Sequence, residues 1–140
     1  MSWDVMLFNT RGQKPPPLDQ LRETDIAPLG PAPEVRERLS NLLPGIDWSD
    51  PTWGTYQGPG FSMEFNVGND ETLRSLMLHI RGGGDAIAAI VAIARPLAWS
   101  VLDCSRGEFL DLDNPSPAGW EQFQAFRDQV LKQVEDPGNA

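Results

Sequence analysis

Apolar and polar residues alternate along several short segments, and this alternation predicts β-strands. In residues 2–8, for example, Trp3, Val5 and Leu7 fall on one face of the segment. The segments with strand character are 2–8, 54–57, 61–67, 73–81, 98–104 and 108–112. Tight turns that contain glycine separate several of them, so we expect consecutive strands to pair in the antiparallel sense.

Three other segments repeat their apolar residues at spacings of three and four, which predicts helices. They are 34–43, 85–95 and a segment that Ser116 can cap and that runs to about Val134. The last helix has a single apolar stripe, made of Trp120, Phe123, Phe126, Val130 and Val134. We expect the second and third helices to cover one face of the sheet.

These elements predict one α+β domain over residues 1–140, with a mostly antiparallel sheet of about five to six strands and two to three helices on it. Residues 9–33 are rich in proline and charge, and they read as a connector on the surface. Their tripeptide Pro15-Pro16-Pro17 favours polyproline II and has the alternative of docking on an aromatic groove. Residues 135–140 are expected to form a frayed tail.

Composition adds a strong negative charge. The chain has 20 acidic and 11 basic residues and a formal net charge of −9. Such a chain repels nucleic acid and anionic lipid and suits a partner with a basic face. One cysteine, no signal-peptide pattern, and a longest apolar run of only residues 86–94 predict a cytoplasmic protein without membrane association.

The stretch Arg81-Gly82-Gly83-Gly84-Asp85 joins a predicted strand to a predicted helix, which is the layout of a phosphate-binding loop. The lysine of a P-loop is missing, and Ile87 occupies the place of the third glycine in a dinucleotide loop. Asp85 can instead cap the helix and accept the N–H groups that a phosphate would use. We therefore interpret Gly82, Gly83 and Gly84 as a corner. The alternative is an anionic-ligand site that also uses His79 and Arg81.

No convincing catalytic or metal site is visible. His79 and Cys104 are the only residues of their types, and both lie on predicted strands. A nucleophilic cysteine needs a base within hydrogen-bond reach, and nothing in the sequence places these two together. A zinc site would need two further ligands. We therefore expect no catalytic residue, no metal and no cofactor.

The loop that follows the first helix combines Trp48 and Trp53 with Asp47 and Asp50. Tryptophan is frequent at the centre of protein interfaces, and neighbouring carboxylates would select a basic partner. One interpretation is therefore a binding surface for a protein with a basic face. The other is that the loop folds over one end of the sheet and buries both rings.

Several phrases of the sequence resemble a group of small, stand-alone bacterial proteins to which no function is assigned. They are Ser2-Trp3-Asp4-Val5-Met6, Asp47-Trp48-Ser49-Asp50-Pro51, Glu64-Phe65-Asn66-Val67-Gly68, His79 to Ile87, and Leu102-Asp103-Cys104-Ser105. In size and acidity the chain is also similar to immunity proteins, which neutralise toxins by binding them. The resemblance implies a bacterial single-domain protein. The acidic residues between Asp47 and Glu71, the two loop tryptophans and the lack of a convincing catalytic set together predict a non-enzymatic protein-binding domain.

Overall fold

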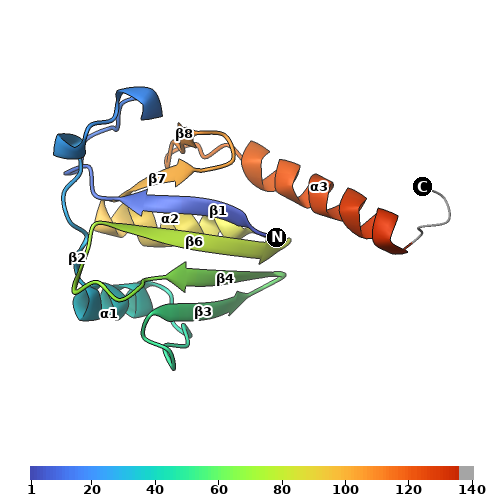
Figure 1. Cartoon of the computed structure of the whole chain (residues 1–140), viewed down its shortest axis with the longest axis horizontal. Coiled ribbons are helices and arrows are strands. Elements are labelled where there is room, and N and C mark those ends of the chain that lie inside the picture. Colours follow the sequence, from blue (N-terminus) through green and yellow to red (C-terminus); the bar gives the residue numbers. More distant parts are fainter. Residues whose placement is uncertain (136–140) are drawn as a thin grey trace.

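The computed structural model describes residues 1–135, and it contains the predicted α+β architecture. A six-stranded antiparallel sheet has the order β3-β4-β6-β1-β7-β8 (Figure 1). Its strands are β1 (Trp3–Phe8), β3 (Trp53–Gly58), β4 (Phe61–Asn66), β6 (Ser75–Gly82), β7 (Ser100–Asp103) and β8 (Glu108–Phe109). The predicted antiparallel pairing is confirmed at every strand pair of this sheet.

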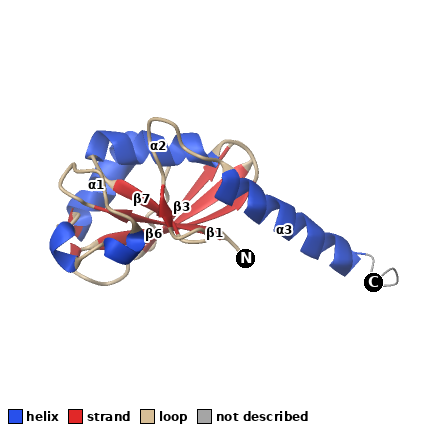
Figure 2. Cartoon of the chain, turned by 90° about the horizontal axis from the view of Figure 1, so that it is seen from above, coloured by secondary structure: helices blue, strands red, loops and turns tan. Residues whose placement is uncertain are grey.

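Two helices, α1 (Ala32–Leu42) and α2 (Ala86–Leu97), cover one face of the sheet (Figure 2). The core forms between them and the sheet because the alternating apolar residues point to that face. Val5, Leu78 and Phe65 lie directly opposite one another on β1, β6 and β4, and all three are fully buried. α2 is apolar on nearly all sides, and its residues Ile90 and Ile93 are fully buried.

The connector of residues 9–33 lies along one end of the sheet. It forms two short 3-10 turns, η1 (Leu18–Gln20) and η2 (Glu23–Asp25), and ends in β2 (Gly30–Pro31). β2 pairs with β5 (Thr72–Leu73) in a separate two-stranded sheet. The predicted strand 73–81 is therefore divided, because its first residues pair with the connector and its remainder belongs to the main sheet.

The third helix, α3 (Ala118–Glu135), departs from the prediction. It was expected to cover the sheet, but only its first turns contact the body, and the remainder projects away (Figures 1 and 2). The helix-covered face of the sheet is already occupied by α1 and α2. Trp120 is 3% exposed, whereas Phe126 and Val134 are 58% and 70% exposed. Of the predicted tail 135–140, Glu135 ends α3 and the rest lies outside the described residues.

Two predicted boundaries also differ. The strand expected over 108–112 ends at Phe109, and its last bond to the sheet is that from Leu110 N to the Val101 carbonyl. The helix expected to end at Arg95 continues through Pro96 to Leu97. Ala98 then stops it with a left-handed backbone at φ 56°.

Candidate functional site

The predicted acidic loop lies between α1 and β3, and each of its two aspartates forms a local turn. Asp47 Oδ1 accepts from Ser49 N at 2.8 Å and from Ser49 Oγ at 2.6 Å. Asp50 Oδ1 accepts from Thr52 N at 2.9 Å and from Thr52 Oγ1 at 2.7 Å. These hydrogen bonds lower the pKa of both carboxyl groups. Both side chains are exposed, so the loop presents two fixed negative charges at neutral pH.

The indole of Trp48 is turned toward the covered side of the sheet. Its ring centroid lies 5.9 Å from that of the buried Phe65, and Nε1 donates to Ser40 Oγ at 2.9 Å. The ring also lies against Gly54, where a Cβ atom would approach it to 2.5 Å. Trp48 is half-exposed and holds the loop against the end of the sheet. This part of the loop follows the interpretation in which the rings support the fold.

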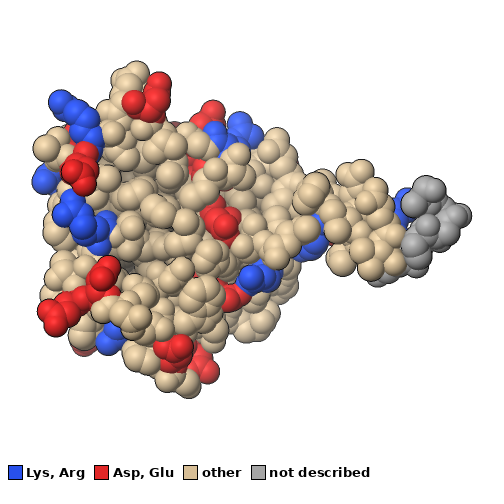
Figure 3. Space-filling view, viewed as in Figure 1, with Lys and Arg blue, Asp and Glu red and all other residues tan. Residues whose placement is uncertain are grey.

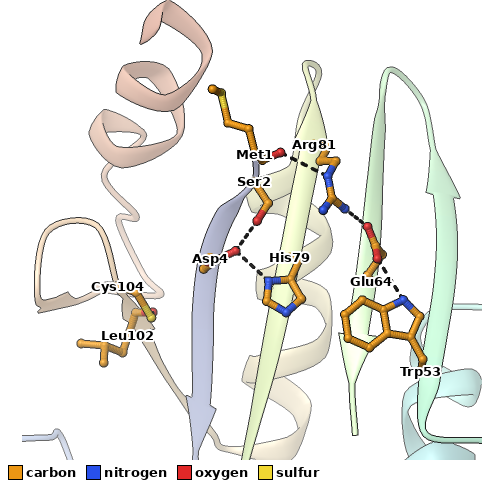
Figure 4. Close-up of polar contacts among 9 residues, drawn as sticks. All are labelled: Met1, Ser2, Asp4, Trp53, Glu64, His79, Arg81, Leu102 and Cys104. Carbon is orange, nitrogen blue, oxygen red and sulfur yellow. Dashed lines mark hydrogen bonds and ion pairs between the residues drawn. The ribbon is translucent and has the colours of Figure 1, made fainter. Parts of the chain in front are cut away.

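Trp53 lies instead on the opposite face of the sheet, the one that α1 and α2 leave uncovered. Its Nε1 donates to Glu64 Oε2 at 2.9 Å, and its ring stacks on His79 with centroids 5.4 Å apart and planes at 19° (Figure 4). The two tryptophans therefore do not form one patch. On the surface, the four predicted residues form two exposed carboxylates beside two partly buried indole rings.

His79 forms part of a polar row across the uncovered face. The strand register places Glu64, His79 and Asp4 side by side on β4, β6 and β1. His79 Nδ1 lies 2.8 Å from Asp4 Oδ1, which also accepts from Ser2 Oγ at 2.5 Å (Figure 4). The carboxylate orients the imidazole as in an acid–base pair. Within residues 1–135, no serine, threonine or cysteine hydrogen-bonds to the imidazole to act as a nucleophile.

Arg81 is committed to neighbours on the same face. It forms an ion pair with Glu64, and its Nε donates to the Met1 carbonyl at 3.1 Å (Figure 4). From the sequence, Arg81 was a candidate residue of an anionic-ligand site. The structure gives it Glu64 as its carboxylate partner instead.

Cys104 follows β7, and its N–H donates to the Asp4 carbonyl at 3.1 Å. Asp4 thus lies between Cys104 and the strand that carries His79. Burial raises the pKa of the Cys104 thiol, and the negative charges of Asp4 and Asp103 raise it further. The thiol is therefore protonated at neutral pH, which is the opposite of what a nucleophilic cysteine needs.

The glycine loop turns the chain at the end of β6, as the corner interpretation predicts. Gly82 and Gly84 have φ values of +98° and +70°, and Gly83 N donates to the Gly60 carbonyl at 2.6 Å. A Cβ atom on Gly82 would lie 2.6 Å from that same carbonyl oxygen. These residues are glycines because the backbone of the β3–β4 turn approaches them so closely.

Two of the N–H donors that a phosphate could use here, those of Gly83 and Ala88, already have acceptors. Asp85 Oδ1 accepts from Ala88 N at 3.1 Å and caps α2, as predicted. On the other side, Trp120 Nε1 donates to the Gly84 carbonyl at 3.0 Å, and Arg127 Nη1 donates to the Gly82 carbonyl. The loop therefore offers acceptors to α3, and the carboxylate of Asp85 occupies a position that an anion would take at the start of α2.

Sequence analysis missed the exposure of α3. After Trp120 stacks against Trp3 and Phe123, the helix leaves the body, and Phe126, Leu131 and Val134 are 58%, 49% and 70% exposed. On the side of α3 seen in Figure 3, some basic side chains lie among uncharged residues. The signal was present in the apolar stripe, but a stripe does not say whether another part of the same chain covers it.

The Pro-rich segment borders a groove of its own. Residues 12–19 and 107–113 line a space of about 1340 Å³ that is floored by the end of α2. The groove therefore places residues 15–17 along the hairpin that β7 and β8 form in this same chain. This position agrees with a surface connector.

Comparison of the chain with protein-family models, with curated proteins and with solved structures found no match. Among residues 1–135, no three His, Cys, Asp or Glu side chains are grouped to hold a metal ion. Nor does any helix in that range combine the length and apolar character needed to cross a membrane.

Proposed function

We propose that this chain is a non-enzymatic, cytoplasmic protein-binding domain that recognises a partner with a basic face, the kind of task that immunity proteins perform. The observation that carries the proposal is the exposed apolar stripe of α3. Phe126, Leu131 and Val134 are large apolar side chains, and each is about half-exposed or more on a helix that projects from the body. Several large apolar side chains exposed on one helix are typical of an interaction site.

Charge supports a basic partner. The net charge of −9 favours encounter with a positive surface, because long-range attraction raises association rates. Asp47 and Asp50 contribute two carboxylates whose geometry is fixed before binding. Trp48 and Trp53 hold the loop in position from the two sides of the sheet. This loop is the proposed electrostatic contact, and the stripe of α3 is the proposed apolar contact.

The alternative function, binding or turnover of a small anionic ligand at His79, Arg81 and the glycine loop, has weaker support. Arg81 is paired with Glu64, and the carbonyls of Gly82 and Gly84 accept from α3. The unfolding temperature of the protein, measured with and without nucleotides and organic phosphates, tests this alternative function. A stabilisation that Arg81→Ala abolishes would favour this alternative over protein binding.

The experiment for the proposed function uses the full chain as bait in cells and then measures the captured protein in pure form. The Phe126→Ser/Val134→Ser double variant should weaken binding at least about tenfold, because the apolar contact is lost. Asp47→Lys/Asp50→Lys should weaken it at low salt, and this effect should shrink as salt rises. Gln129→Ser, a substitution at an exposed polar position of α3, is the matched control.

Circular dichroism must show that each variant keeps the wild-type fold. A captured partner that binds all variants with wild-type affinity would show that neither surface is the binding site. It would then remove the basis of the proposal.

A further inference from the structure

A cleft of about 410 Å³ lies at the root of α3, where the helix leaves the sheet. One wall comes from the start of β1 and the turn after β7, and the other comes from α3. The side chains that matter here are Ser2, Asp4, Cys104 and Ser105 on the sheet side, and Phe123 and Phe126 on the helix. The cleft therefore combines an apolar wall with a polar, acidic wall.

Two carboxyl groups at the acidic wall, those of Asp4 and Asp103, each make side-chain hydrogen bonds through only one of their oxygens. Both side-chain hydrogen bonds of Asp4 use Oδ1, and its side chain is 39% exposed. Behind the cleft, Asp103 is 1% exposed, and its Oδ2 is the one buried side-chain oxygen or nitrogen in residues 1–135 without a hydrogen-bond partner. Asp4 pairs with His79, but among residues 1–135 no lysine or arginine forms an ion pair with Asp4 or Asp103, so the wall can accept a basic head group.

The cleft continues into the stripe of α3. Phe126 is both a wall of the cleft and the first strongly exposed apolar residue of the helix. Val130 and Val134 follow at intervals of four residues, so they lie on the same side of the helix. Cleft and stripe thus form one surface, with a carboxylate at one end and about 12 Å of apolar helix beyond it.

We propose that this surface docks an amphipathic helix of a partner protein, which places an arginine or lysine side chain in the cleft beside Asp4. The stem of the basic side chain lies on Phe123 and Phe126, and its head reaches the carboxylate. The apolar face of the partner helix packs along Val130 and Val134. This inference rests on the proposed function and names the chemistry of the partner.

A second copy of this chain fits the surface less well. Two copies of net charge −9 repel each other. Arg127 of α3 is held by Asp128 and by the Gly82 carbonyl. Lys132 follows Val130 by two residues, which places it about 200° around the helix from the stripe. Neither basic residue of the described part of α3 is therefore placed to enter the cleft of a second copy.

The test uses fluorescein-labelled peptides of about 18 residues, five turns of helix. Each has leucines along one face and, at one end of that face, either arginine or glutamine. The wild-type protein should bind the arginine peptide about tenfold more tightly than the glutamine peptide, the usual scale of a charge-assisted hydrogen bond. Fluorescence polarisation at low and high salt measures both affinities.

Asp4→Asn should reduce this preference to less than about twofold and leave the affinity for the glutamine peptide unchanged. Phe126→Ser should weaken both peptides alike. Asp113→Asn is the matched control, because Asp113 is an exposed carboxylate that pairs with Arg95 away from the cleft. It should keep the full preference. Thermal unfolding of each variant shows whether the fold is intact.

Equal affinity of the wild type for the two peptides, or no binding at millimolar peptide, would overturn this inference. So would a concentration-dependent dimer that Phe126→Ser dissociates, since it would make a second copy the occupant. A captured natural partner that loses affinity when α3 is changed, found together with equal binding of the arginine and glutamine peptides by the wild-type protein, would refute only the basic side chain proposed for the cleft. If the partner ignores both α3 and the Asp47 loop, the proposed function itself fails.

Discussion

Replacing Gly119 with alanine sets two effects of opposite sign against each other. Gly119 lies in the first turn of α3, where alanine in place of glycine favours the helix by up to about 1 kcal/mol. A Cβ atom there would overlap Asp103 Oδ2 and would lie 2.8 Å from Asp103 Cγ and 3.0 Å from Trp3 Nε1. The result shows whether helix propensity or packing decides at this position.

The structure indicates that packing decides. Asp103 is buried, and its Oδ1 accepts from Trp3 Nε1 at 3.0 Å and from Ser105 Oγ at 2.6 Å. Displacing the carboxylate weakens a hydrogen bond to a charged group, worth about 1.5–3 kcal/mol. Overpacking costs about 1–3 kcal/mol more. After the gain in helix propensity, we expect Gly119→Ala to lower the free energy of unfolding by about 1.5–5 kcal/mol.

Urea denaturation followed by tryptophan fluorescence measures this loss. A double-mutant cycle identifies its cause, because Asp103→Ala removes the atoms that the new methyl group would overlap. In that background Gly119→Ala should cost at least about 2 kcal/mol less than in the wild type. A Gly119→Ala variant as stable as the wild type would refute the reasoning. An equal cost in both backgrounds would show that Asp103 is not the obstacle.

Three further substitutions test the corner and the cleft. Asp85→Ala should lower the free energy of unfolding in urea by about 0.5–2 kcal/mol, since it removes the cap of α2; an unchanged value would mean that the cap contributes nothing. Gly82→Ala should lower the free energy of unfolding by at least about 1 kcal/mol more than Gly68→Ala does, because both glycines have positive φ but only Gly82 faces close backbone atoms. Equal losses of stability in the two variants would leave backbone strain at positive φ as the sole cause. Asp4→Asn should lower the pKa of the Cys104 thiol toward its ordinary value, so the thiol should react faster with a disulfide reagent at pH 8. Burial, the larger cause of the raised pKa, remains in that variant, and an unchanged pH–rate profile would exclude Asp4 as a cause.

Periodicity predicted the parts of the fold that depend on local pattern. Alternation alone placed Trp3, Val5 and Leu7 on the buried face of β1, and all three are at most 1% exposed. Trp120, which begins the apolar stripe predicted for the last helix, is buried as well. Pattern works here because one face of each such element must be removed from water.

The contacts on the uncovered face were beyond sequence reasoning. Alternation puts Asp4 and His79 on the outward faces of their strands, but their hydrogen bond depends on the register between strands 75 residues apart. The pairing of Arg81 with Glu64 depends on the register of β4 with β6 in the same way. No local signal carries such a register.

The glycine loop and the last helix are separate features in the sequence, but in the structure the loop carbonyls bind side chains of that helix. A helix that leaves the body can be held only through its first turns, so those turns need strong partners. The carbonyls of Gly82 and Gly84 supply them to Arg127 and Trp120. The positive φ of the two glycines shapes the corner that carries these carbonyls. The loop therefore anchors α3 to the body. A helix anchored at this position leaves Phe126 exposed beside the cleft at Asp4.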